Sequence, residues 1–176
     1  MKKFAVIGNP IKHSLSPALH NWVFKSLEID AEYEKKRVFQ NQLAGIIGDL
    51  HCGKLDGINV TIPHKGNIMQ YLDEINPRAK SIGAVNLIIK NGNKLVGNNT
   101  DWYGFTMALK KNGVDPSGKE VIVLGAGGAA RSIIFSLKQS GIKKIVLLNR
   151  TLQKAKILQD EIVFPSSLED SVMAIK

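Results

Sequence analysis

The sequence is poor in cysteine and has no long apolar run. Cys52 is the only cysteine among the 176 residues, and no apolar stretch reaches the roughly 18 residues that a membrane-spanning helix needs. The four histidines are scattered, and no Cys/His cluster has the spacing of a zinc site. These absences exclude an intrachain disulfide and predict a protein of the reducing cytoplasm, without a membrane span or a bound metal.

Acidic residues are also scarce. The chain has 15 Asp and Glu against 24 Lys and Arg, and the resulting net charge of +9 raises the question of a nucleic-acid partner. The lysines occur in short groups at the ends of predicted elements, as at 2–3, 110–111 and 143–144, and no aromatic platform accompanies them. We therefore expect no nucleic acid. A net positive charge also suits the binding of small anions, such as a phosphate-bearing cofactor and a carboxylate substrate.

The first part of the chain alternates strand and helix patterns. A helix should start at Ser16, which would cap it, with Pro17 at its first position. Its apolar stripe comprises Leu19, Trp22, Val23 and Leu27. The other expected elements are strands at 2–7, 33–39 and 57–63, a helix at 43–50 and a hairpin around 91–93. This βαβ rhythm predicts an α/β fold with a mainly parallel sheet.

The second part of the chain shows a change of pattern after a turn cluster at residues 115–119, which we take as the domain boundary. Residues 1–114 then form a substrate-binding catalytic domain that includes a linking helix at 101–112, and residues 115–176 form a partial cofactor domain of the Rossmann type. The elements expected in the second domain are strands at 120–125 and 143–150, helices at 127–141 and 152–161, and a third strand starting near Val172.

The run VIVLGAGGAARS is the most specific single motif. Gly125, Gly127 and Ala130 fit the pattern G-x-G-x-x-G/A between a strand and a helix. Gly125 permits a tight turn, Gly127 lets a pyrophosphate approach the backbone, and Ala130 keeps the helix close to the sheet. The helix start offers free N–H groups to phosphate. The predicted phosphate-binding residues are Gly125, Ala126, Gly127, Gly128, Ala129 and Ala130.

The end of the next strand indicates which dinucleotide is bound. An NAD site usually has an acidic residue here, about 20 residues after the glycines, to hold the ribose 2′-hydroxyl. This chain has Asn149, Arg150 and Thr151, with Lys154 one helical turn further on. An acidic residue would repel a 2′-phosphate, whereas these side chains would attract it. We therefore expect NADP as the cofactor.

Polar side chains in the first part gather at predicted strand ends. Each has an ordinary structural explanation when it is taken singly: a helix cap for Ser16, and hydrogen bonding to loop backbone for Asn59 and Asn86. His13 and His64 fit surface or hydrogen-bonded histidines better than catalysts. Together the amides, hydroxyls, amine and carboxylate suit a small polyhydroxylated acid. The candidate substrate residues are Ser14, Ser16, Asn59, Thr61, Lys65, Asn86 and Asp101.

Six ordered motifs give the chain a resemblance to the shikimate dehydrogenase family: VIGNPIKHSLSPALHN, INVTIPHK, IGAVN, GNNTDWYGF, VLGAGGAARS and NRT. The resemblance covers residues 4 to about 156. It implies NADPH-dependent interconversion of 3-dehydroshikimate and shikimate in aromatic amino-acid biosynthesis. It also implies that the candidate residues above contact the substrate and that Lys65 and Asp101 form the catalytic pair. Residues 125–130 and 149–151, with Lys154, would hold NADP.

The chemistry of ketone reduction agrees with these roles. The cofactor supplies a hydride to carbon, and the protein must supply a proton to oxygen. A primary amine is protonated at neutral pH, and an adjacent carboxylate favours that charged form. We therefore expect Lys65 to act in the reductive direction as an orienting, proton-donating cation that Asp101 fixes in place.

The chain departs from the family in two places. Leu87 follows Asn86 where the family usually has threonine. The later family segment is also missing, including a substrate-contacting glutamine and a C-terminal helix, so we expect a truncated form of doubtful activity. The strands near 121–125 and 145–148 should then lose one flank of their sheet, and exposed strand edges favour self-association.

Two alternatives to the leading interpretation stay open. One is the quinate/shikimate dehydrogenase branch, although Asn149 and Arg150 argue against its NAD-using members. The other is a non-catalytic, truncated binding module.

Overall fold

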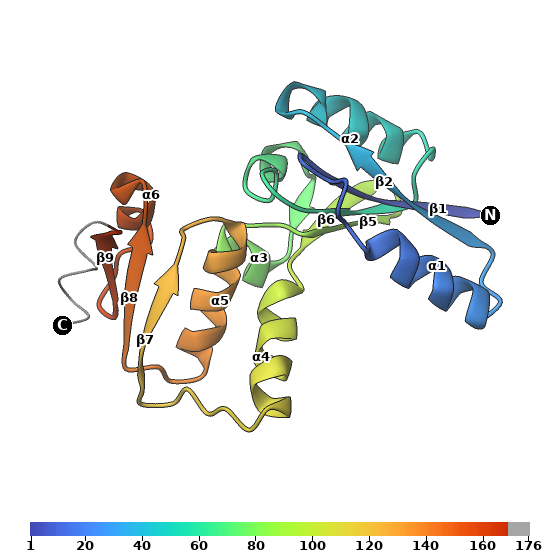
Figure 1. Cartoon of the computed structure of the whole chain (residues 1–176). Helices are drawn as coiled ribbons and strands as arrows, with labels where there is room; N and C mark the ends of the chain where they lie inside the picture. Colours follow the sequence, from blue (N-terminus) through green and yellow to red (C-terminus); the bar gives the residue numbers. More distant parts are fainter. Residues whose placement is uncertain (169–176) are drawn as a thin grey trace. The chain divides into compact units, whose positions relative to one another are not determined.

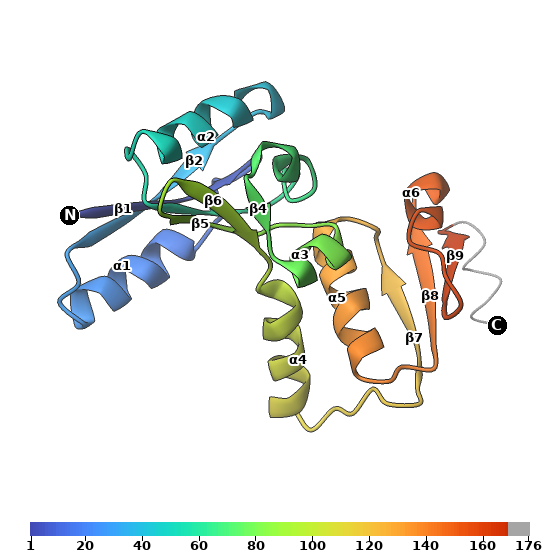
Figure 2. The ribbon, with the colours of Figure 1, turned by 180° about the vertical axis from the view of Figure 1, so that it is seen from behind.

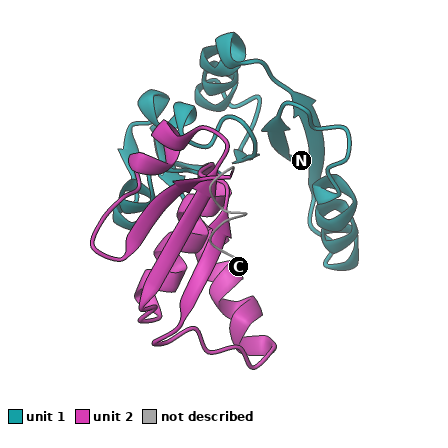
Figure 3. Cartoon of the chain, turned by 60° about the vertical axis from the view of Figure 1, so that its left-hand side comes forward, with its two compact units in different colours: residues 1–99 teal, residues 100–176 magenta. Residues whose placement is uncertain are grey.

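The computed structural model describes residues 1–168, which belong to two compact units, residues 1–99 and 100–176 (Figure 3). The division precedes the helix at 101–111 and therefore groups it with the second unit. The boundary expected at 115–119 falls inside that unit. The strand expected near Val172 lies outside the described residues.

The first unit contains the predicted strands and helices and some that the sequence did not suggest (Figure 1). The predicted elements are β1 (Lys2–Gly8), α1 (Ser16–Ser26), β2 (Ala31–Arg37), α2 (Leu43–His51), β3 (Gly57–Val60), β5 (Leu87–Asn91) and β6 (Lys94–Asn98). The additional ones are the short 3₁₀ helices η1 (Gln40–Gln42) and η2 (Asn67–Tyr71), the strand β4 (Glu74–Ile75) and the helix α3 (Pro77–Ile82).

The six strands of this unit form one sheet in the order β2-β1-β3-β5-β6-β4. The pairings of β1 with β2 and β3 and of β4 with β6 are parallel, whereas β5 is antiparallel to both β3 and β6. The α/β class with a mainly parallel sheet is thus confirmed, and the hairpin around 91–93 is present. Because β3 and β5 run in opposite directions, the end of β3 and the beginning of β5 lie side by side.

Helices α1 and α2 cover opposite faces of this sheet, as the two opposite views show (Figures 1 and 2). The α2 side holds the main core, in which Leu43, Leu50 and Ile58 are almost fully buried. On the α1 side, Phe24 packs on Phe4, with 5.8 Å between the ring centroids. The predicted apolar stripe of α1 is not a core face within this unit. Most of its members are largely exposed: Leu19 (66%), Trp22 (70%) and Leu27 (65%).

The second unit contains α4 (Asp101–Lys111), β7 (Glu120–Leu124), α5 (Gly128–Gln139), β8 (Lys144–Asn149), α6 (Leu152–Lys156) and β9 (Val163–Ser167). Its three strands are parallel in the order β7-β8-β9. Helix α4 packs along α5, where the Thr106 and Ser136 hydroxyls are 2.7 Å apart and the Trp102 ring lies edge-on to Phe135. These contacts explain why α4 groups with this unit.

The predicted helix at 152–161 is too long, and the strand after it was missed. Helix α6 ends at Lys156, and the Asp160 carboxylate accepts hydrogen bonds from the N–H groups of Ile162 and Val163, which turn the chain into β9. Pro165 lies inside β9. Proline cannot donate to a ladder and is therefore confined to sheet edges, the position that β9 occupies among the described strands.

The expectation that β7 and β8 both lack a neighbour holds for β7 alone. Within residues 1–168, β8 pairs on both sides, whereas β7 pairs only with β8. On the face of β7 that points away from α5, Ile122 and Leu124 are 53% and 71% exposed. Parallel sheets are normally covered on both faces, so this exposed apolar face is unusual.

The described part of the chain has no helix that is long and apolar enough to cross a membrane. The longest helix among residues 1–168, α5, has 12 residues, and about 20 are needed for a span. This agrees with the absence of long apolar runs in the sequence.

Gly8 is a position where the fold demands a glycine. A Cβ atom there would lie 2.5 Å from Thr61 Cγ2 and 2.9 Å from the Ile62 carbonyl oxygen, so β1 or the segment after β3 would have to shift. We expect Gly8→Ala to lower the free energy of unfolding by about 1–3 kcal/mol, measured by chemical denaturation.

The matched control is Gly45→Ala in α2. A Cβ atom at Gly45 would meet no atom within 4 Å, and alanine is the better helix former. The change should stabilise the protein by about 0.5–1 kcal/mol. Equal effects of the two substitutions would contradict the close approach at Gly8.

Candidate active site

The predicted substrate residues of the first unit lie around one edge of its sheet. The carboxyl ends of the parallel strands β1 and β3 reach this edge, and the antiparallel β5 begins there. Asn59 stands opposite Leu87 in the ladder, and the N–H of Val60 donates to the Asn86 carbonyl oxygen at 2.9 Å. The Asn59 Nδ2 amide donates to the same oxygen at 3.2 Å. Asn59 and Asn86, which are 27 residues apart in sequence, are thus joined directly.

Ser14 and Ser16 are close to each other in the connection from β1 to α1. Their Oγ atoms are 3.2 Å apart, and the Ser16 N–H donates to Ser14 Oγ at 3.3 Å. The prediction that Ser16 caps α1 is wrong, because Ser16 is the first helical residue and no side chain bonds back from the N-cap position, Leu15. The Ser16 hydroxyl is therefore not used as a cap.

Tyr33 is a polar group of this edge that the sequence did not identify. It lies on β2 and is 4% exposed, and its hydroxyl donates to Asn59 Oδ1 at 2.7 Å. Burial raises the pKa of Tyr33 to about 12, although a hydrogen bond from Ser16 lowers it in part. The one available signal was that Tyr33 is the sole large apolar residue in the strand AEYEKKR.

Lys65 lies in the loop between β3 and η2, and backbone hydrogen bonds hold this loop from both sides. The Thr61 N–H donates to the Ile7 carbonyl and the Asn9 N–H to the Ile62 carbonyl, each at 2.9 Å, which ties the loop to β1. The Val85 N–H donates to the carbonyl of Lys65 itself at 2.8 Å. The backbone of Lys65 is therefore fixed, and its partly exposed side chain starts from a defined point.

His64 adds a side-chain anchor to the same loop. It is 1% exposed, and its Nε2 lies 2.7 Å from the Val38 carbonyl oxygen, just beyond β2. A carbonyl can only accept, so Nε2 must carry the proton. Nδ1 has no hydrogen-bond partner among the described residues. His64 is thus a hydrogen-bonded structural histidine, as the sequence suggested.

Asp101 begins α4 in the second unit, where it is the acidic residue of the first turn. A carboxylate there is favoured by the helix dipole. Its pairing with Lys65 stays a prediction, because the two residues belong to different units.

The predicted phosphate cradle connects β7 to α5. Gly125 has φ +96°, a conformation that side chains rarely adopt, and its N–H donates to the Leu148 carbonyl at 2.7 Å. A Cβ atom on Gly127 would meet no protein atom within 4 Å, so this face of the turn is open. Helix α5 has no side-chain cap and no acidic residue in its first turn. Its first N–H groups can therefore donate hydrogen bonds to an anion, as the binding of a dinucleotide pyrophosphate requires. Ala130 is buried against the core.

Asn149 supports the glycine turn from β8. Its Oδ1 accepts from the Ala126 N–H at 3.2 Å, and its Nδ2 donates to the Thr151 carbonyl at 2.7 Å. The amide therefore links the cradle to the start of α6, with one Nδ2 hydrogen left for another acceptor. Arg150, Thr151 and Lys154 follow as exposed residues. This exposed polar and basic group is the part of the unit that fits a 2′-phosphate.

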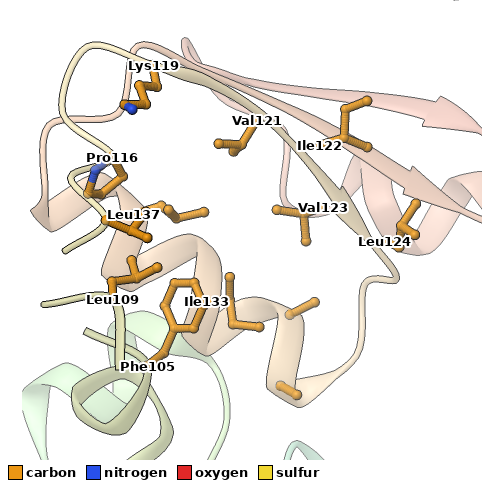
Figure 4. A pocket seen from close by; sticks show the side chains of 13 residues that line it. Phe105, Leu109, Pro116, Lys119, Val121, Ile122, Val123, Leu124, Ile133 and Leu137 are labelled. Atoms are coloured by element: carbon orange, nitrogen blue, oxygen red, sulfur yellow. The ribbon is translucent and has the colours of Figure 1, made fainter. Parts of the chain in front are cut away.

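An apolar hollow of the second unit lies elsewhere, between β7 and the helices α4 and α5 (Figure 4). It has a volume of about 430 Å³, and its walls include Phe105 and Leu109 of α4, Val123 of β7 and Ile133 of α5. Val121 and Val123 point into it in Figure 4, whereas Ile122 lies on the other side of the strand. Its apolar lining suits packing against another protein segment better than binding a charged cofactor.

Two family models match the chain. The shikimate dehydrogenase substrate binding domain matches residues 6–88, and shikimate / quinate 5-dehydrogenase matches residues 106–173. Curated relatives named shikimate dehydrogenase (NADP(+)) include proteins from Bacillus cereus strain G9842, 48% identical, and Bacillus anthracis strain CDC 684, 49% identical, each over 156 residues. Those matches cover 88% of this chain and 56% of each relative, so the chain spans little more than half of their length.

Solved shikimate dehydrogenase structures share the fold. The Aquifex aeolicus enzyme superposes with a TM-score of 0.90 at 36% identity, covering 99% of this chain and 66% of that one. The Thermus thermophilus enzyme in complex with NADP(H) and shikimate gives a TM-score of 0.81 at 39% identity, covering 90% and 59%.

Proposed function

Because the chain belongs to the shikimate dehydrogenase family, we propose that it serves the NADPH-dependent, reversible reduction of 3-dehydroshikimate to shikimate in aromatic amino-acid (chorismate) biosynthesis, in the cytoplasm. The observation that carries the proposal is the Lys65 loop, held by backbone bonds next to the joined pair of Asn59 and Asn86. The Thermus thermophilus relative was solved with shikimate and NADP(H), which supports both ligands.

In this proposal the first unit holds the substrate. The Asn59 and Asn86 amides and the Thr61, Ser14 and Ser16 hydroxyls offer donors and acceptors for the substrate's hydroxyl and carboxylate groups. Lys65 donates the proton that the carbonyl oxygen gains, and Asp101 keeps the ammonium group oriented. NADPH, when bound, would supply the hydride.

In the second unit, the turn from Gly125 to Ala130 would hold the pyrophosphate of NADP at the start of α5. The residues present fit this role, because the Gly127 position is open and the helix start is uncapped. Arg150, Thr151 and Lys154 would hold the 2′-phosphate, with Asn149 fixing the turn on which they stand.

One other function has specific support. Quinate/shikimate dehydrogenation is favoured because the family model that matches residues 106–173 describes shikimate / quinate 5-dehydrogenase.

We further propose that the chain self-associates through β7. The partner at the β7 edge is a second copy of this chain. A two-fold axis would pair the two β7 strands antiparallel and join two three-stranded sheets into one. The exposed Ile122 and Leu124 and the apolar hollow beside β7 supply the hydrophobic surface for this contact.

The catalytic proposal is tested with Lys65→Ala. We expect turnover of shikimate with NADP to fall by about 10²–10⁴-fold, because a proton donor is lost, while the shikimate dissociation constant changes less. Lys80→Ala, an exposed change in α3, is the control. Near-normal turnover of Lys65→Ala refutes the role of Lys65. Shikimate binding without turnover in the unchanged protein indicates the binding module instead.

The cofactor proposal is tested with Arg150→Ala. Loss of a charge-assisted contact to the 2′-phosphate should weaken NADP binding by about 10–100-fold and leave NAD binding unchanged. Isothermal titration calorimetry measures both constants, and Lys110→Ala on α4 serves as a charge-matched control. NAD binding as tight as NADP binding to the unchanged protein would contradict the preference.

Self-association is tested with Ile122→Lys. Light scattering should find the unchanged chain as a dimer at micromolar concentration and this variant as a monomer, because a charge at the edge opposes strand pairing. Ile157→Lys, at a residue 70% exposed just after α6, should stay dimeric. A monomeric unchanged chain overturns this proposal without affecting the enzymatic one.

A further inference from the structure

Tyr33 links a predicted substrate residue of β3 to the region of α1. Its hydroxyl donates to Asn59 Oδ1 at 2.7 Å, and Ser16 at the start of α1 lies close enough to lower its pKa in part. One buried phenol oxygen thus lies between the start of α1 and the end of β3. Neither the motifs nor the comparisons assign it a role.

Tyr33 is itself held by two residues of α1. The Asn21 amide forms two hydrogen bonds of 2.8 Å with the Tyr33 backbone, one to its N–H and one to its carbonyl. The His20 ring stacks on the phenol ring with 4.3 Å between centroids and 10° between planes. The phenol can therefore fix its partners, because it has little freedom of its own.

The bonds on Asn59 fix which way its amide points. Oδ1 accepts from Tyr33, and Nδ2 donates to the Asn86 carbonyl oxygen. A flipped amide would place Oδ1 against that carbonyl, which can only accept. One Nδ2 hydrogen is then left in a defined direction for an oxygen atom of a ligand. Burial raises the pKa of Tyr33 to about 12, so the hydroxyl keeps its proton at any pH near neutrality.

We propose that Tyr33 is a positioning residue for the substrate: its hydroxyl fixes the Asn59 carboxamide in the orientation that binds a hydroxyl group of a small polyhydroxylated acid. The identity of the ligand rests on the proposed function. The ordering of Asn59 does not, because it follows from the hydrogen bonds within this unit.

The first test is Tyr33→Phe, which removes one oxygen atom and keeps the ring. Two-dimensional NMR of the assigned Asn59 side-chain amide should show a shifted resonance with faster hydrogen exchange. Tyr71→Phe is the control, since Tyr71 packs on the core of the same unit. An Asn59 resonance that responds no more to Tyr33→Phe than to Tyr71→Phe overturns the proposal, whatever the ligand.

The second test measures shikimate affinity by calorimetry. Tyr33→Phe should weaken binding about five- to tenfold, the equivalent of one hydrogen bond, and Tyr71→Phe should not. In an Asn59→Ala background, Tyr33→Phe should change the affinity by less than about twofold, because Tyr33 acts through Asn59. If the losses of affinity from Tyr33→Phe and Asn59→Ala add up in the double variant, Tyr33 does not act through Asn59 and the proposal is overturned. Failure of the unchanged protein to bind shikimate, with the NMR effect present, would reject the proposed function and leave the ordering of Asn59 supported.

Discussion

The candidate active site depends on the contact between the end of β1 and the segment that follows β3. Gly8 allows this contact, because any side chain there would collide with Thr61 and with the Ile62 carbonyl. Two backbone hydrogen bonds of 2.9 Å, one on each side of Gly8, then bind the segment to β1. With the buried His64 bonded to Val38, the loop is held by side chain and backbone alike. A flexible lysine on a rigid loop can be aimed at a substrate, whereas one on a mobile loop cannot.

The polar groups around this loop are ordered by one another. The Asn59 carboxamide accepts a hydrogen bond from the Tyr33 hydroxyl and donates one to the Asn86 backbone carbonyl, and such bonds allow polar groups to be partly buried without a large cost. The glycine turn of the second unit is held in a similar way, because the Asn149 side chain forms hydrogen bonds with both the Ala126 N–H and the Thr151 carbonyl just before α6. Asn59 in the first unit and Asn149 in the second were both predicted to contact a ligand. Each also forms a hydrogen bond to the backbone near other predicted ligand-binding residues.

The two units differ in how completely they are covered. The first has helices on both faces of its sheet and a continuous core. The second has a free β7 edge and exposed apolar side chains on one face among the described residues, next to an apolar hollow. Apolar area of this kind is stabilised by burial, so this unit is the one whose stability should depend most on association.

The sequence by itself determined the α/β class, the positions of most strands and helices, the glycine turn and the family, because these follow from periodicity, turn residues and short motifs. It could not determine the end of α6 or the existence of β9. Pro165 argues against a strand in the sequence, and β9 forms only because it pairs with β8. The sequence also misjudged the stripe of α1 and the cap at Ser16. Only the tertiary structure decided that Tyr33 bonds Asn59 and that His64 anchors the Lys65 loop, because both bonds join β2 and its exit to a segment about 26 residues away, and no local pattern encodes such a contact.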